Sequence, residues 1–279
     1  MLDSVIDSIV LIALAEDLSS GDITTDSCIP LSARSVAHAV ARRPMTACGA
    51  TVFARVFARV DASLKVEVHE VDGARVPAGA RLWSVSGSSR AILMGERTAL
   101  NLTQRMTGVA TLTRSYVDAL PKGSATRIAD TRKTTPGLRA LERYAVRVGG
   151  GHNHRDNLGS AVLIKDNHIV AAGGIHAAIT RARAYAPHTS RIECEVDSID
   201  QLVVALDAGA DIVLLDNMNT ETVRQAVALT RGRAIVEASG GVTLARIAEL
   251  AEAGVDVISS GALTHSAPAA DIGLDFDPV

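Results

Sequence analysis

The second half of the chain alternates between short apolar runs and longer segments with helical periodicity. The apolar runs are rich in Val, Ile and Leu: ATRIADT (125–131), AVLIKDN (161–167), RIECEVD (191–197), DIVLLDN (211–217), AIVEASGG (234–241) and VDVISSGA (255–262). The Ala-rich segments between them commonly end in Gly, which is the residue preferred just after a helix. Strands that are apolar along their whole length are typical of parallel sheets. The pattern predicts a (β/α) barrel over about residues 110–265.

The number of apolar runs limits how complete this barrel can be. Six runs are convincing strands, whereas a closed barrel of this kind has eight. We therefore expect an incomplete barrel. In barrels and open parallel sheets alike, the functional site lies at the carboxyl ends of the strands.

The first part of the chain has a different pattern, which favours antiparallel strands. Stretches of alternating polar and apolar residues are broken by the turn sequences DG, PAG and SGS; they lie at 35–43, 65–71, 74–87 and 89–94. A helical segment at about 91–120 follows and joins the two parts. The apolar residues of 1–18 are interspersed with acids, and we interpret this segment as an amphipathic helix. The tail holds one more short strand, whose partner the sequence does not identify.

Composition excludes several classes of function. Hydrophobic residues make up 47% and charged residues 21% of the 279 positions, which is enough for a core and unlike a disordered chain. Aromatic residues are only 3% and the net charge is -3, so we expect no nucleic-acid partner. The apolar N-terminal run is short and lacks early positive charges, so we expect no membrane span and no signal peptide. Three scattered cysteines favour reduced thiols and a cytoplasmic location.

Cations gather at the end of the first predicted barrel strand. Thr131, Arg132 and Lys133 follow this strand directly, and the turn GGGHNHR then supplies His154 and Arg155. A guanidinium presents a planar fork to carboxylates or phosphates, and an ammonium acts as a point charge. This excess of cations in a slightly acidic chain indicates an anionic ligand. The alternatives are a surface basic pair and a flexible loop with a solvated Arg155.

Lys165 stands within an otherwise apolar predicted strand, where a charge is costly unless it is paired or functional. It can bind an anion, or form a Schiff base if its pKa is depressed. A third possibility is a structural ion pair with Asp130 or Asp166. The surrounding cations favour the anion-binding role.

Carboxylates end the next two predicted strands. Glu193, Glu195 and Asp197 alternate and therefore share one face, and Asp216 ends the following strand. They suit Mg²⁺, directly or through water, or sugar hydroxyls. The alternative is that they pair with nearby Arg and Lys side chains. Because these carboxylates would repel an anionic ligand, we expect Mg²⁺ to intervene.

Glycine-rich turns end the last two predicted strands, at Ser239-Gly240-Gly241 and Ser260-Gly261-Ala262. Such turns expose backbone N–H groups, and barrels commonly bind a phosphate on the loops after their last two strands. We therefore expect a phosphate here, with plain tight turns as the alternative.

Seven motifs taken together resemble one known family. DTRKT-PGLR, GGG-NHR, IKDNH, EVD, LLDN, EASGG and GALTHS follow one another in the order found in quinolinate phosphoribosyltransferases, and EDLSSGDITTD and ERTALNL near the start are also similar. Any one motif is weak, but the ordered set runs nearly end to end and is specific. The resemblance implies a pentosyltransferase of NAD biosynthesis. Such enzymes convert quinolinate and phosphoribosyl pyrophosphate to nicotinate mononucleotide, pyrophosphate and CO₂.

The resemblance also implies an architecture. An N-terminal α/β sandwich domain with its linking helix would occupy residues 1–109, and the incomplete barrel would occupy 110–266. The tail at 267–279 would return to the N-terminal domain. The family forms homodimers with shared sites, and Arg97 matches a position that reaches the neighbour's site.

Site roles follow from the matched motifs. Lys165, Glu195 and Asp216 would be catalytic, with Glu195 and Asp216 near the ribose hydroxyls and Mg²⁺, and no organic cofactor is implied. The implied substrate-binding residues are Arg97, Thr131, Arg132, Lys133, His154, Arg155, Lys165, Glu195, Asp216, Ser239, Gly240, Gly241, Ser260, Gly261 and Ala262. Within this set, Arg132, His154, Arg155 and Lys165 match quinolinate contacts, and Lys133 matches a pyrophosphate contact. Ala238 departs from the family pattern, since a Ser is expected there.

Two other functions stay open from the residues alone. One is a Schiff-base aldolase or lyase that uses Lys165 on the same barrel. The other is a non-catalytic sensor of a phosphate ligand. The crowded cations argue against the first, and the complete set of cations and carboxylates argues against the second.

Overall fold

The computed structural model describes residues 3–278. The chain divides into two compact units that interleave along the sequence. The first unit comprises Met1–Arg114, Thr134–Gly150 and Leu263–Val279, and the second comprises Ser115–Lys133 and Gly151–Ala262. Each unit is described by itself.

The first unit is built on a four-stranded sheet in the order β12-β1-β5-β3, with antiparallel pairs throughout. Its strands are β1 (Arg34–Ala41), β3 (Lys65–Val68), β5 (Arg81–Ser88) and β12 (Ile272–Phe276). Ala37 of β1 pairs with Phe276 on one side and Val85 on the other. The tail strand therefore completes the first sheet as its edge. A separate pair joins β2 (Met45–Thr46) and β4 (Arg75–Val76).

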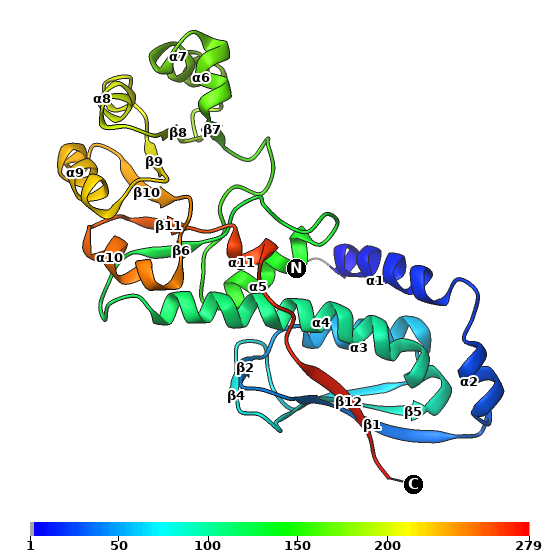
Figure 1. Cartoon of the computed structure of the whole chain (residues 1–279). Helices are drawn as coiled ribbons and strands as arrows, with labels where there is room; N and C mark the ends of the chain where they lie inside the picture. Colours follow the sequence, from blue (N-terminus) through cyan, green and yellow to red (C-terminus); the bar gives the residue numbers. More distant parts are fainter. Residues whose placement is uncertain (1–2, 279) are drawn as a thin grey trace. The chain divides into compact units, whose positions relative to one another are not determined.

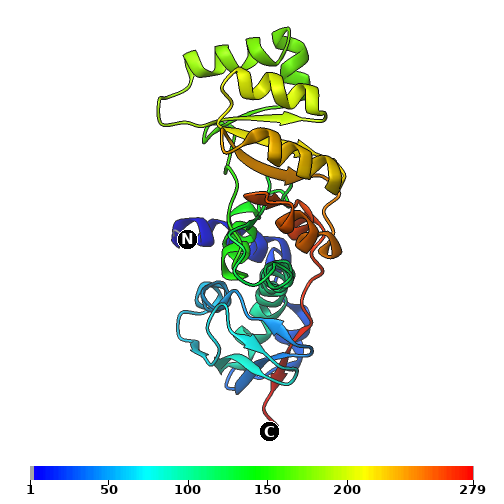
Figure 2. The same cartoon turned by 90° about the vertical axis from the view of Figure 1, so that its left-hand side faces the viewer.

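The helices of this unit come from several stretches of the chain. They are α1 (Asp3–Leu18), α2 (Ile23–Cys28), α3 (Ala50–Val60), α4 (Ser89–Asp118), α5 (Arg139–Val148) and α11 (Ala262–His265), the ends of α4 and α11 crossing between the units. α3 and α4 lie over the same face of the sheet (Figures 1 and 2). Phe53 of α3 packs against Phe57 and Trp83, and all three rings are fully buried. A Cβ on Gly95 of α4 would meet the Phe57 ring at 2.9 Å, so α4 packs tightly on α3.

Three expectations for the first unit were wrong or incomplete. Residues 89–94 begin α4 instead of forming a strand, because β5 ends at Ser88, whose Oγ accepts the N–H of Ala91 at 3.5 Å. The helix α3 was missed, although its buried side chains recur with helical spacing. The helix α1 exists but is not cleanly amphipathic, since Leu11 and Ile12 are 51% and 71% exposed.

The second unit contains six parallel strands in the order β6-β11-β10-β9-β8-β7. The strands are β6 (Arg127–Ala129), β7 (Val162–Ile164), β8 (Ile192–Val196), β9 (Ile212–Asp216), β10 (Ile235–Ser239) and β11 (Val257–Ser259). The helices are α6 (Asp166–Ala172), α7 (Ile175–Tyr185), α8 (Ile199–Asp207), α9 (Thr220–Thr230) and α10 (Ile247–Glu252), with a short 3₁₀ turn η1 (Leu244–Arg246). All six predicted barrel strands are thus confirmed.

The sheet of the second unit does not close within the part of the chain that the structure describes. β6 and β7 lie at its two edges and are not paired with each other. The helices α7 to α10 follow one another along one side of the sheet (Figure 1). Gly209 and Gly254 have φ angles of 83° and 91° just after α8 and α10, as expected of residues that end helices. The α/β fold with an incomplete barrel is therefore confirmed.

Among residues 3–278, every helix is too short or too polar to cross a bilayer.

Candidate active site

A cavity of about 320 Å³ lies within the second unit at the carboxyl ends of its strands. Nine of its lining residues belong to the predicted set: Thr131, Arg132, Lys133, His154, Arg155, Lys165, Glu195, Asp216 and Ser239. Leu163, Leu214, Glu237 and Ser259 complete the lining. Side chains separated by more than a hundred residues in sequence thus meet because parallel strands end at one edge of the sheet.

Asp130, which directly follows β6, organises the cation-bearing turn at residues 149–155, between α5 and β7. It is fully buried, and its two carboxylate oxygens accept the side-chain N–H of Asn153 at 2.6 Å and the backbone N–H of His154 at 2.7 Å. Arg155 donates from its guanidinium to the carbonyl oxygen of Ala161 at 3.1 Å. Burial, together with the nearby charge of Arg132, lowers the pKa of Arg155. The turn after the three glycines is therefore ordered, and the flexible-loop alternative does not hold.

Lys165 does not lie inside a strand. β7 ends at Ile164, and Lys165 is the residue before α6, with a side chain that is 45% exposed. Its ammonium forms an ion pair with Glu195, at the end of β8. The alternative of a structural ion pair with Asp130 or Asp166 is therefore wrong, because the carboxylate that pairs with Lys165 is that of Glu195. The burial cost assumed from the sequence does not arise, because the side chain reaches out of the apolar strand into the cavity.

Two buried acidic residues lie against His154, and one of them, Glu237, lines the cavity. Glu193 of β8 and Glu237 of β10 are each 4% exposed, and both face the imidazole of His154. His154 Nε2 lies 3.2 Å from Glu193 Oε2 and 3.6 Å from Glu237 Oε1. Burial opposes the imidazolium, but the hydrogen bond and charge of Glu193 and the charge of Glu237 outweigh it and raise the pKa of His154. Burial and the charge of Glu193 raise the pKa of Glu237 to about 7.

Two sets of residues are candidates for a cation. Glu195 and Asp216 end neighbouring strands, are only partly buried and offer carboxylate oxygens to the cavity, which are the donors that Mg²⁺ prefers. His154, Glu193 and Glu237 bring their donor atoms within 4.8 Å of one another. The second set is a poor match to Mg²⁺, which keeps several waters and favours oxygen ligands. Glu195 and Asp216 therefore fit the expected cation better.

The glycine-rich turn after β10 requires its glycines. Gly240 and Gly241 have φ angles of 81° and 55°, and a Cβ on Gly240 would lie 2.4 Å from the Asn217 side-chain oxygen. Ser239 of this turn lines the cavity, whereas Gly240 and Gly241 do not. The turn after β11 holds Ser260, whose N–H donates to the carbonyl oxygen of Ala129. Ser260, Gly261 and Ala262 are also outside the cavity lining.

Arg97 belongs to the first unit, where it lies exposed on α4. It is therefore not among the residues that line the cavity of the second unit.

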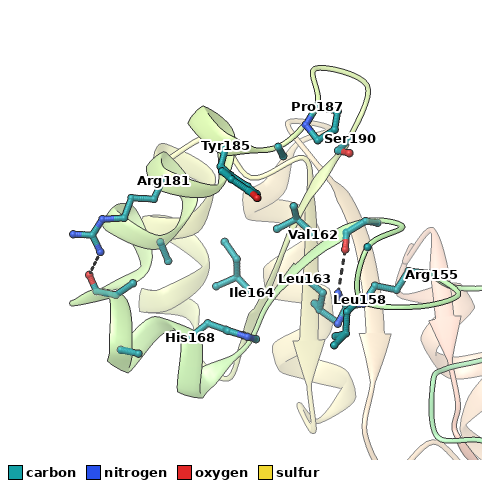
Figure 3. Close-up of a pocket in the computed structure, with 16 residues that line it drawn as sticks. Arg155, Leu158, Val162, Leu163, Ile164, His168, Arg181, Tyr185, Pro187 and Ser190 are labelled. Atoms are coloured by element: carbon teal, nitrogen blue, oxygen red, sulfur yellow. Dashed lines mark hydrogen bonds between the residues drawn. The ribbon is translucent and has the colours of Figure 1, made fainter.

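A larger hollow of about 610 Å³ lies beside β7 and shares Arg155 and Leu163 with the cavity. Figure 3 shows its mainly apolar lining, with Val162 and Ile164 from β7 and Tyr185 from the end of α7. Arg181 donates to the carbonyl oxygen of Ala172 at 2.8 Å and thereby ties α7 to α6. The smaller cavity holds the convergent charged groups, so we assign the chemistry to it despite its lesser volume.

Sequence reasoning missed the roles of Asp130, Glu193 and Glu237. Glu237 stands directly in the motif EASGG, and Glu193 shares a strand face with Glu195. Acidic residues inside apolar runs were the available signal, because a buried carboxylate needs partners.

Comparison with known proteins identifies the family to which this chain is similar. The family model described as quinolinate phosphoribosyl transferase, C-terminal domain, matches residues 109–275, and the model of its N-terminal domain matches residues 22–107. The nicotinate-nucleotide pyrophosphorylase (carboxylating) of Mycobacterium leprae is 44% identical over 270 residues, covering 95% of this chain and 94% of that protein. The probable enzyme of the same name from Bacillus subtilis is 42% identical over 260 residues, covering 93% and 89%.

Solved structures agree with these relatives. The crystal structure of NadC from Streptococcus pyogenes superposes with a TM-score of 0.93 at 40% identity, covering 100% of this chain and 99% of that one. The nicotinate-nucleotide pyrophosphorylase of Francisella tularensis gives a TM-score of 0.94 at 38% identity, covering 99% and 98%.

Proposed function

Because the chain belongs to the quinolinate phosphoribosyltransferase family, we propose that it transfers the phosphoribosyl group of phosphoribosyl pyrophosphate to quinolinate. The products would be nicotinate mononucleotide, pyrophosphate and CO₂, as in NAD biosynthesis. The observation that carries the proposal is the cavity of the second unit, in which cations and carboxylates converge at the ends of parallel strands. Such a cavity suits a dicarboxylate and a sugar phosphate at once.

The cations would hold the dicarboxylate. Arg132, His154, Arg155 and Lys165 all line the cavity and would bind the two carboxylates of quinolinate. His154 supports this role, because its raised pKa favours the charged imidazolium, which attracts an anion more strongly than the neutral ring does. Lys133 would bind the pyrophosphate. Thr131 would contribute its hydroxyl beside them.

The phosphoribosyl group would lie against the central strands. Glu195 and Asp216 would accept hydrogen bonds from the ribose hydroxyls. The 5-phosphate would be held by N–H and hydroxyl groups of the two turns formed by Ser239, Gly240, Gly241, Ser260, Gly261 and Ala262.

The ion pair between Lys165 and Glu195 links the two proposed subsites. Lys165 belongs to the dicarboxylate subsite and Glu195 to the ribose subsite. Their contact would hold the pyridine nitrogen near carbon 1 of the ribose, and such orientation supplies much of the rate enhancement in two-substrate reactions.

The reaction then needs little covalent chemistry from the protein. The nitrogen lone pair forms a bond to carbon 1 while the bond from carbon 1 to the pyrophosphate oxygen breaks, and pyrophosphate leaves with that electron pair. The 2-carboxylate next departs as CO₂. The electron pair it leaves is stabilised by the adjacent pyridinium nitrogen until carbon 2 takes a proton. The residues orient the substrates and offset charge.

We propose Mg²⁺ as the cation and Glu195 and Asp216 as the residues that hold it, directly or through water. When bound, it would offset the negative charge of the pyrophosphate. No organic cofactor is needed, because the substrate supplies its own electron sink.

Lys165 is poorly suited to the alternative Schiff-base chemistry. An ammonium paired with a carboxylate has no lone pair with which to attack a carbonyl. The sensor alternative receives no support from the relatives, whose names describe enzymes.

We further propose a homodimer in which the partner's Arg97 completes each site, and a cytoplasmic location. The exposure of Arg97 on α4 supports the dimer, and the scattered cysteines support the location. The dimer is tested by mixing inactive Arg97→Ala and Lys165→Ala proteins. Exchange should restore about one quarter of wild-type turnover, because half of the dimers are hybrids with one intact site each. No recovery after verified exchange would argue against shared sites.

The proposed activity is tested directly with purified protein, Mg²⁺ and phosphoribosyl pyrophosphate. Quinolinate should yield CO₂ and mononucleotide, whereas nicotinate, which lacks the 2-carboxylate, should yield neither. Equal turnover of nicotinate, or none of quinolinate, would contradict the proposal.

A further inference from the structure

We propose that Arg105 and Glu142 act as a positioning pair for phosphoribosyl pyrophosphate binding, although neither lines the cavity. The pair holds two segments of the first unit, residues 134–138 and 264–267, which we call the anchored segments. The inference rests on the site assignment proposed above.

Glu142 of α5 is fully buried, and its carboxylate is committed to two partners. Its Oε1 accepts from Arg105 Nε at 2.9 Å and Nη2 at 2.8 Å. The same oxygen accepts from the hydroxyl of Thr135 at 2.7 Å, and Oε2 accepts from the Thr135 backbone N–H at 3.0 Å. Backbone and side chain of Thr135 are thus both held, which fixes the first anchored segment.

Arg105 of α4 holds the second anchored segment with the remaining donors of its guanidinium. Nη1 donates to the carbonyl oxygen of Ala267 at 2.7 Å, and Nη2 donates to the carbonyl oxygen of Thr264. A planar fork with five N–H donors can make these contacts together, whereas a lysine cannot. One guanidinium therefore connects the first anchored segment, through Glu142, to the second.

The chain beyond Ala267 is also fixed along α4. The Gln104 side chain donates to the carbonyl oxygen of Ile272 at 2.7 Å, and its backbone oxygen accepts from Ala270 at 2.9 Å. A Cβ on Gly108 would lie 2.0 Å from the carbonyl oxygen of Pro268, so only glycine permits this approach. The second anchored segment therefore has little freedom to move.

Each anchored segment directly continues a stretch that we assign to phosphoribosyl pyrophosphate. Thr135 comes two positions after Lys133, the proposed pyrophosphate contact, and Thr264 comes three positions after Gly261, in the proposed phosphate turn. Displacement of either segment would move a proposed contact at one end of the ligand. Glu142 is fully buried and the Arg105 side chain is 21% exposed, and such a pair suits this task because removing one partner leaves the other uncompensated.

Three variants test the pair. Arg105→Lys keeps the charge but loses the fork, and Thr135→Val removes one hydroxyl and no charge. Arg55→Lys is the matched control: it changes another ion-paired arginine of the first unit, which contacts Asp3 and Asp7 and neither anchored segment. Turnover of quinolinate by the wild type tests the proposed function itself. If the wild type shows no turnover, the Kd of each protein for phosphoribosyl pyrophosphate, measured by calorimetry, takes the place of KM.

We expect Arg105→Lys and Thr135→Val to raise the KM or Kd for phosphoribosyl pyrophosphate by about tenfold to a hundredfold, as small misplacements of binding groups do. The KM for quinolinate should rise less, since only one of the two anchored segments adjoins a quinolinate contact. Amide exchange of residues 134–138 should accelerate in both variants, and the control should match the wild type. A lowered Tm with unchanged affinity would make the pair merely structural and overturn the inference. Thr135→Val decides the outcome if Arg105→Lys does not fold.

Discussion

At their carboxyl ends, the edge strands and the central strands of the parallel sheet present opposite charges to the cavity. The edge strands β6 and β7 lead into Arg132, Lys133 and Lys165, whereas the central strands β8, β9 and β10 carry carboxylates. The Lys165 side chain at an edge is 45% exposed, but Glu193 and Glu237 at the centre are each 4% exposed. Long cationic side chains can keep their charge in water from an edge position. Carboxylates in the middle must share protons or hydrogen bonds instead.

This difference separates two tasks. In the proposed site, the edge cations would exchange a protein carboxylate for a ligand carboxylate. The buried central acids Glu193 and Glu237 instead face another side chain, the imidazole of His154. His154 illustrates the division, because its imidazole lines the cavity but is held from below by Glu193.

The largest effect is expected from removing an edge cation. Lys165→Ala should lower turnover by about 10² to 10³, comparable to loss of a preorganised electrostatic contact. The Tm should change little, because the side chain is half exposed. Steady-state kinetics and thermal melts check both statements. Lys65→Ala, on the exposed edge strand β3 of the first unit, is the control and should behave as wild type. Near-normal turnover of Lys165→Ala would remove this residue from the site.

A smaller effect is expected from the partly buried acids of the central strands. Glu195→Gln and Asp216→Asn should each lower turnover about tenfold to a hundredfold, because hydrogen bonds to charged groups contribute about 1.5 to 3 kcal/mol. Each should also raise the Mg²⁺ concentration needed for half-maximal turnover. A magnesium titration of wild type and variants gives the answer. An unchanged magnesium requirement in both variants would exclude them as the cation's ligands.

The smallest effect is expected from Glu237, a buried acid of a central strand, and it concerns the free energy of unfolding. The pKa of Glu237 is raised by burial to about 7, above its ordinary value of 4.5. The native state therefore keeps a proton that the unfolded state loses between these pH values, and this contribution to stability falls as pH rises through the window. Glu237→Gln should remove this pH-dependent contribution to stability. Relative to wild type, the variant should gain on the order of 1 to 3 kcal/mol between pH 4.5 and 8.

Denaturant unfolding at several pH values measures this difference. The exposed Glu221, changed to Gln, supplies the control and should show no such trend. A constant difference between Glu237→Gln and wild type across the pH range would show that the pKa of Glu237 is the same in the folded and unfolded states.

Much of the fold could be predicted from the sequence. Buried parallel strands need continuous apolar runs, and all six were recognised for that reason. The helix at Ala50–Val60 was missed and residues 89–94 were misassigned, because short apolar stretches fit both periods and tertiary packing decides between them. The partner of β12 was not identifiable, since pairing between distant strands leaves no local signal.

The cations of the candidate site could be predicted from the sequence, whereas the residues that hold them in place were less predictable. The strand ends recognisable in the sequence predict that Arg132, Lys133 and Lys165 lie together at the carboxyl ends of the parallel strands. The pairing of Lys165 with Glu195, and the burial of Asp130 beneath Asn153 and His154, depend on register between strands. Register and burial of polar groups emerge only when the chain is assembled.

The pairing of β12 with β1 has a consequence for biosynthesis. The nascent chain exposes the unsatisfied edge of β1 on the ribosome while the whole parallel unit is still being translated. The amino-terminal unit can gain its last strand only after that unit has emerged. Folding of the first unit therefore depends on completion of the second. Until then, the unpaired edge of β1 is where a chaperone that shields it would bind.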